Sequence, residues 1–253
     1  MNHRILKSKL LWIFLITACC VLSLVTYNKY TSTKLESAAG AHGFSIFWWE
    51  VQTVPLKWMH LLWEMYPGNA PTHSERYLIV QEYLQLSRKL EKESSRVENA
   101  LLAKGLTEPT NITKMIDEDL AELIFQKKIL RNRAEEAVEA AVSEAATQNE
   151  LGLPFGILFP PTDFRLEEPP LILISSPRNK IVLEGSHLIK NSIGFRDRFR
   201  IESKVESDGE TSALVDNLSG LGTYPAFVSD KYDLRYLMRT AAHEWLHNYW
   251  IFK

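Results

Sequence analysis

The first apolar pattern in the chain is an uncharged run of 18 residues, Leu10–Tyr27. As a helix, this run would span about 27 Å, close to the roughly 30 Å hydrocarbon core of a bilayer. Arg4, Lys7 and Lys9 precede it without any acidic residue, and basic residues favour the cytoplasmic side of a membrane. The pattern predicts a cytoplasmic segment over 1–9, a transmembrane anchor over 10–27 and an extracytoplasmic remainder, that is, a single-pass protein of the cell membrane.

Two alternatives to an uncleaved anchor remain open. Residues 16–19 resemble a bacterial lipobox, which would place a lipid on Cys19, but residues 20–25 stay apolar where lipoproteins turn polar. A cleaved signal peptide needs a small-x-small site, and the run closes without a convincing one.

Cys19 and Cys20 are the only cysteines of the sequence, so a disulfide scaffold and a Cys₄ zinc site are excluded.

An aromatic segment, 44–66, lies within the stretch 28–71 and holds four of the seven tryptophans. Tryptophan is favoured at membrane interfaces, because its ring is apolar and its N–H needs a wet partner. Leu56–Tyr66 is therefore predicted either to lie along a membrane surface as an amphipathic helix or to pack against neighbouring helices.

Residues 72–149 are predicted to form an antiparallel helical hairpin. Thr72 and Glu75 form a capping-box pattern, and a helix is expected from there to about Lys104. After a short turn, a second helix is expected from about Ile112 to Thr147, because apolar positions recur there in steps of four and three. These positions are Ile116, Leu120, Leu123, Leu130, Ala134, Ala137 and Ala141, with Lys127 as the one interruption.

The role expected for the hairpin is that of a spacer. The charges on the outer face of its second helix, such as Glu135, Glu136 and Glu139, are predicted to face solvent. Homo-oligomerisation through the hairpin, as a coiled coil, is the alternative.

Beyond Asn149, paired prolines and short apolar runs replace the helical pattern. A glycine-containing loop, 219–222, is too short and misplaced for a dinucleotide fingerprint. Ser229 or Asp230 is expected to cap a last helix that runs to the end of the chain. Strands are predicted at 171–174, 181–183, around 187–189, and at 199–205, 213–215 and 226–228.

The composition excludes two further classes of protein. Hydrophobic residues make up 45% and charged residues 24% of the chain, which is ordinary globular usage and excludes a wholly disordered chain. The net charge is −2, so binding of nucleic acid driven by charge has no support, and no nucleic-acid partner is expected.

The last predicted helix carries the chemistry, because it contains His243, Glu244 and His247 in an H-E-x-x-H pattern. Histidines four apart lie on one helix face and can share one tetrahedral Zn²⁺. Glu244 lies beside the metal, where it can take a proton from zinc-bound water, whose pKa the ion lowers to about 7. It can then give that proton to the leaving amine. From the composition, such a pattern would occur by chance about 0.02 times in the chain.

This helix resembles the zinc-binding helix of the zincin metallopeptidases over about residues 229–253. Thr240 stands where these helices favour Val or Thr, and Tyr249 where they favour a bulky apolar residue. The residues around and between the histidines are uncharged, as in the family: Ala241, Ala242, Trp245, Leu246 and Asn248. The metzincin branch is excluded, because Trp250 and Lys253 stand where it has Gly and His.

The resemblance to gluzincin-like enzymes implies an acidic third zinc ligand on a later helix. The acids Asp216, Asp230 and Asp233 precede the motif, which is the wrong order for that pattern. The third ligand is therefore expected beyond Lys253, and we expect the sequence to be a fragment of a longer protein.

Together these patterns predict an α+β fold with a transmembrane helix, a helical hairpin over 72–149 and, over 150–253, a partial mixed-sheet zincin subdomain that ends in the H-E-x-x-H helix. The predicted function is that of a membrane-anchored, extracytoplasmic zinc peptidase acting on peptides or proteins. One rival is a non-catalytic membrane-anchored scaffold with an incomplete zincin domain. Another keeps the zinc for structure or for hydrolysis of a different bond.

Overall fold

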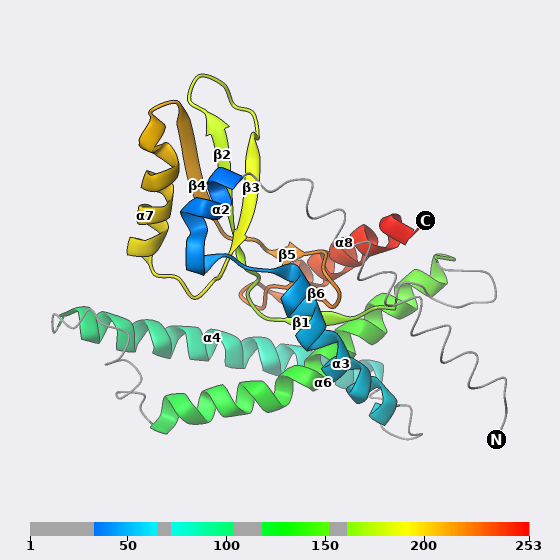
Figure 1. Cartoon of the computed structure of the whole chain (residues 1–253). Helices are drawn as coiled ribbons and strands as arrows, with labels where there is room; N and C mark the ends of the chain where they lie inside the picture. The colour runs from blue at the N-terminus through cyan, green and yellow to red at the C-terminus, as the bar shows by residue number, and fades with distance from the viewer. Residues whose placement is uncertain (1–32, 65–71, 104–117, 152–160, 253) are drawn as a thin grey trace. The chain divides into compact units, whose positions relative to one another are not determined.

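The computed structural model describes residues 33–64, 72–103, 118–151 and 161–252 (Figure 1). The chain divides into two compact units, each built from two separate stretches of sequence. The first unit combines residues 1–59 with 169–218, and the second combines residues 60–168 with 219–253.

The predicted fold class is wrong in its membrane part. Among the described residues, no helix is both long and apolar enough to cross a bilayer. The two longest, α4 (His73–Ala103) and α6 (Glu118–Gln148), have 31 residues each, but charged side chains occur along their whole length. Over that part of the chain the fold is α+β, with six α-helices and two small sheets.

The predicted span itself, residues 10–27, lies outside the described residues, and so does Cys19. The single-pass cell-membrane localisation predicted from that span is corrected together with the fold class, because no described helix supports it.

The first unit is a three-stranded antiparallel sheet with helices against it (Figure 1). The sheet order is β3 (Gly185–Ile189), β2 (Leu171–Pro177) and β4 (Thr211–Asp216). Two helices, α2 (Thr33–Ala39) and α7 (Phe195–Val205), pack on it. Their shared core consists of alternate strand residues and one face of each helix: Leu171, Leu173, Ile189, Val215, Leu35, Ala39, Ile201 and Val205. Short 3₁₀ turns follow these helices, η1 (Gly40–His42) and η2 (Glu206–Asp208).

Two predicted strands of this unit are wrong. Residues 199–205 belong to α7, because Ile201 and Val205, which also fit an alternating pattern, lie four apart on the buried face of a helix. Phe199 is accordingly 63% exposed. Residues 181–183 form an exposed loop. They lie between β2 and β3, and the last pair of that ladder is Ser175 with Gly185. The other predicted strands, at 171–174, 187–189, 213–215 and 226–228, are confirmed within β2, β3, β4 and β6 (Ala226–Val228).

The aromatic segment is helical over most of its length, as α3 (Ile46–Glu64). Trp48 on this helix is exposed, and Glu50 and Val54 are buried. A membrane-surface role for the segment stays a prediction.

The second unit is built on the predicted hairpin. The helices α4 and α6 pack against each other and run antiparallel, since His73 at the start of α4 lies 3.0 Å from Glu144 near the end of α6. One half of the predicted capping box is present, because the Thr72 N–H donates to the Glu75 carboxylate at 2.7 Å; the Thr72 hydroxyl also donates to that carboxylate, at 2.6 Å. The predicted turn between the helices lies outside the described residues.

The inner stripe of α6 is confirmed, with Leu120, Leu123 and Ala134 buried. Lys127 interrupts it for a physical reason: its Nζ lies 2.6 Å from the buried carboxylate of Asp230. A charged residue can occupy a buried stripe when it is paired in this way.

The sheet of this unit is mixed, with the order β1 (Phe164–Leu166), β6, β5 (Gly220–Leu221). Strands β1 and β6 are parallel, and β5 runs antiparallel to β6 at the opposite edge. The last helix, α8 (Leu234–Phe252), packs against β6 and β5. The sheet, α8 and the hairpin share one apolar core, which includes Tyr83, Leu84, Val138, Phe164, Leu166, Val228, Leu237 and Trp245.

The prediction that Glu135 and Glu139 face solvent is wrong. Glu135 is 1% exposed and accepts a hydrogen bond from the Leu166 N–H at 3.0 Å. Glu139 accepts one from the Phe164 N–H at 2.9 Å. The two glutamates, one turn apart on α6, thus satisfy alternate N–H groups on the outer edge of β1, and an edge strand must satisfy those groups somehow.

We expect Glu135→Ala to lower the free energy of unfolding by about 1–3 kcal/mol, because a buried N–H loses its acceptor. Denaturant titration measures this loss. Glu122→Ala, at an exposed position of the same helix, is the control and should change the free energy by less than about 0.5 kcal/mol. Equal effects of the two substitutions would contradict the role of Glu135.

Candidate functional site

Helix α8 positions all three predicted site residues. It begins after Asp233, whose Oδ1 accepts a hydrogen bond from the Tyr236 N–H at 2.8 Å. The predicted caps, Ser229 and Asp230, are therefore wrong. The helix buries one face in the core of the second unit through Leu237, Ala241, Trp245 and Tyr249.

The two histidines lie on the opposite, exposed face of α8. The Nε2 atoms of His243 and His247 are 3.0 Å apart, and their rings are perpendicular. Two nitrogen ligands of one tetrahedral Zn²⁺, each at 2.0–2.1 Å, would be about 3.3 Å apart. The observed separation is close to that value, and it also suits a hydrogen bond between two neutral rings. The predicted pairing of the two imidazoles is thus present.

Glu244 lies beside the histidines but is 7% exposed. Two glycines lie against its carboxylate: Gly220 on β5 and Gly222 directly after that strand. A Cβ at Gly220 would lie 2.5 Å from Glu244 Oε1, and one at Gly222 would lie 3.0 Å from His247 Cβ. Any side chain at residue 220 would therefore displace the carboxylate or the strand.

Burial raises the pKa of Glu244 from its usual 4.5 to about 7. Desolvation disfavours the charged form of a carboxyl group, and among the described residues no hydrogen bond or ion pair involves this side chain. A buried acid of this kind, next to an exposed histidine pair, is typical of functional sites.

A third metal ligand is not found in the part of the chain that the structure describes, where no group of three or more His, Cys, Asp or Glu side chains could hold an ion. The acids considered from the sequence have other roles. Asp233 caps α8, Asp216 lies on β4 in the first unit, and Asp230 is buried among residues of the hairpin.

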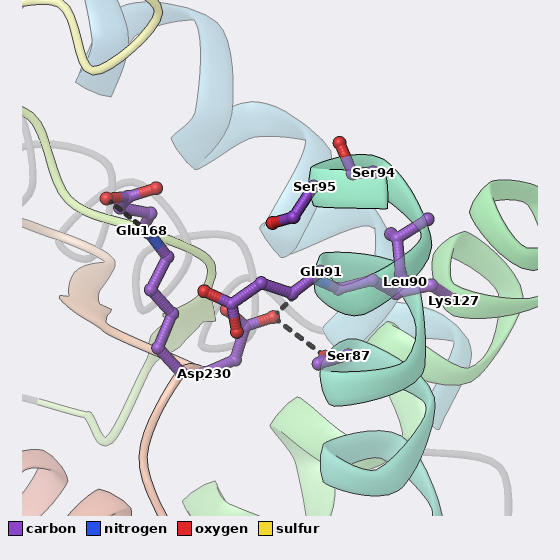
Figure 2. A pocket seen from close by; sticks show the side chains of 9 residues that line it. Ser87, Leu90, Glu91, Ser94, Ser95, Lys127, Glu168 and Asp230 are labelled. Atoms are coloured by element: carbon purple, nitrogen blue, oxygen red, sulfur yellow. Dashed lines mark hydrogen bonds and ion pairs between the residues drawn. The ribbon is translucent and has the colours of Figure 1, made fainter. Parts of the chain in front are cut away.

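Asp230 is the centre of a polar cluster and lines a pocket of about 350 Å³ (Figure 2). Its Oδ2 accepts hydrogen bonds from the Tyr83 hydroxyl at 2.7 Å and from the Ser87 hydroxyl at 3.1 Å. The same oxygen forms an ion pair with the Lys127 Nζ. Two other lining residues, Lys231 and Glu168, are joined by a hydrogen bond of 2.9 Å that Lys231 donates. The cluster ties the segment before α8 to both helices of the hairpin.

Sequence reasoning missed the glycines at 220 and 222 and the role of Asp230. The glycine-containing loop carries no local signal of this role, since its contact with Glu244 depends on how α8 packs against β5. Lys127 was the one available signal for Asp230, because a lone charge in an apolar stripe requires a buried partner.

Comparison with known proteins assigns no family: no protein-family model, no curated protein and no solved structure matches this chain. The zincin resemblance therefore rests on the motif in α8.

We expect Glu244→Gln to stabilise the metal-free protein in a pH-dependent way. The folded-state pKa lies above the unfolded value, so the parent loses stability as the pH rises from about 4.5 through 7. Glutamine carries no charge at any pH. The variant should match the parent at pH 4 and be more stable by roughly 2–3 kcal/mol at pH 8.

Denaturant titrations at both pH values, with a chelator present, measure this difference. Glu122→Gln, at an exposed position, is the control and should show no such pH dependence. A Glu244→Gln effect of the same size at pH 4 and pH 8 would contradict the raised pKa.

Proposed function

We propose that this chain carries the zinc-binding helix of a peptidase that hydrolyses peptide bonds in peptides or proteins. His243 and His247 hold the ion, and Glu244 is the general base and then the general acid. The observation that supports the proposal most directly is the convergence of two exposed imidazoles beside a buried carboxylate that has no partner among the described residues.

The residues present fit zinc in two respects. The two Nε2 atoms are spaced for one ion, and their exposure leaves room for a substrate to approach. A catalytic zinc site normally has three protein ligands. No third ligand lies among the described residues, so the proposal requires an acidic side chain from elsewhere in the protein.

Bound zinc would supply Lewis acidity, which acidifies water and polarises a carbonyl group. Glu244 would accept the proton that the attacking water loses and then donate it to the leaving amine. Gly220 leaves the space that the Glu244 carboxylate occupies, since a Cβ there would lie 2.5 Å from Oε1.

The rival proposal is a non-catalytic scaffold that uses the same helix for assembly. It is favoured by one observation, the presence of only two metal ligands among the described residues. Homo-oligomerisation through α4 and α6 belongs to this alternative and stays a prediction.

The proposal predicts distinct effects of substitutions within the motif. Glu244→Gln should keep its zinc and lose about 10²–10⁴-fold in peptide hydrolysis, because the base is removed but no ligand is lost. His243→Ala and His247→Ala should lose zinc and activity together. Zinc stoichiometry and the hydrolysis rate of the purified protein check all three variants.

His73→Ala is the matched control. His73 is exposed, lies on α4 rather than on the motif helix α8, and pairs with Glu144 of α6. It should keep both zinc and rate. Loss of zinc in Glu244→Gln would make Glu244 a ligand, and full activity in that variant would exclude the proposed mechanism. A zinc-binding parent that hydrolyses no peptide would favour the scaffold.

A further inference from the structure

The turn that covers Glu244 has a compact shape of its own. It runs from β5 to β6, over residues 220–225. The Thr223 N–H donates to the Leu221 carbonyl at 2.8 Å, and the Thr223 hydroxyl donates to the Pro225 carbonyl at 2.7 Å. These bonds fix the form of the turn but do not attach it to α8.

One side chain of α8 makes that attachment. Asn248 is buried, and its Nδ2 donates to the Thr223 carbonyl at 3.0 Å. Asn248 directly follows His247 and lies one helical turn beyond Glu244, so it belongs to the same side of α8 as the carboxylate.

The attachment sets how closely the turn approaches the site. Gly222 lies against His247, and Gly220 lies against Glu244 and the Thr240 side chain. The turn and α8 are packed closely here, since an added Cβ at Gly220 would meet atoms at 2.5–2.7 Å. Without the Asn248 bond, the buried Thr223 carbonyl would lose its partner, which costs free energy until the turn lifts towards water.

We propose that Asn248 is a positioning residue, which holds the 220–223 turn over Glu244 through its bond to Thr223. The role of this bond in catalysis rests on the proposed function, whereas its effect on the turn does not. Correct placement of a catalytic group within a fraction of an ångström is worth large factors in rate.

Asn248→Asp tests the proposal, because it keeps the size of the side chain and replaces the donor with an acceptor. Asn248→Gln keeps a donor and serves as the rescue variant. Hydrogen exchange at the amides of residues 220–223 reports on the turn, and zinc content, kcat and KM report on the site. The amides of α6, in the same unit as the turn, show whether that unit has been destabilised as a whole, and those of β2 serve as a reference in the other unit.

Asn248→Asp is expected to speed exchange at residues 220–223 at least tenfold, with α6 and β2 unchanged. Zinc content should stay at the parent level, kcat should fall about 10–100-fold, and KM should change less than threefold, as expected when only transition-state interactions are lost. Asn248→Gln should recover most of the protection and of kcat.

Unchanged exchange at residues 220–223 in Asn248→Asp would overturn the proposal. Faster exchange with an unchanged kcat would also overturn it, since Asn248 would then be merely structural. If Asn248→Asp fails to fold, Asn248→Ala, which removes the donor without adding a charge, decides by the same two readouts. A parent without hydrolysis would contradict the proposed function, while the exchange data would still decide whether Asn248 holds the turn.

Discussion

Buried carboxylates whose donors come from other elements hold together the unit that carries the histidine helix. Asp230 is placed between the two hairpin helices and accepts from Tyr83 and Ser87 while it pairs with Lys127. An unpaired buried charge is costly, so both hairpin helices must stay in contact with the segment that leads into α8. The start of α8 is thereby fixed against the hairpin, and the helix can present its histidines from a rigid base.

The same kind of interaction places the sheet on which α8 rests. Glu135 and Glu139 accept from the edge of β1, β1 pairs with β6, and β6 pairs with β5. The last strand of this sheet, β5, contains Gly220, which lies directly against Glu244. The hairpin expected to be a spacer is therefore part of the unit that shapes the candidate site, and its glutamates contribute to the fold rather than to a solvated surface.

Local patterns in the sequence predicted the features that local physics determines. The i, i+4 spacing placed His243 beside His247, and the inner stripe of α6 was confirmed from Leu120 onward. The pattern at Phe199–Val205 suited a strand and a helix equally, and packing decided between them. The roles of Glu135, Asp230 and Gly220 depend on partners far away in sequence, which no local pattern reveals. The zinc ligands and the catalytic role of Glu244 stay predictions.

The proposed function requires that His243 and His247 jointly hold a zinc ion. X-ray absorption spectroscopy of the zinc-loaded protein, compared with His247→Ala, tests it most directly. The account predicts two imidazole nitrogens at about 2.0–2.1 Å from the zinc in the parent and one fewer in the variant. Identical spectra for the two proteins, or a parent spectrum without imidazole scattering, would contradict it.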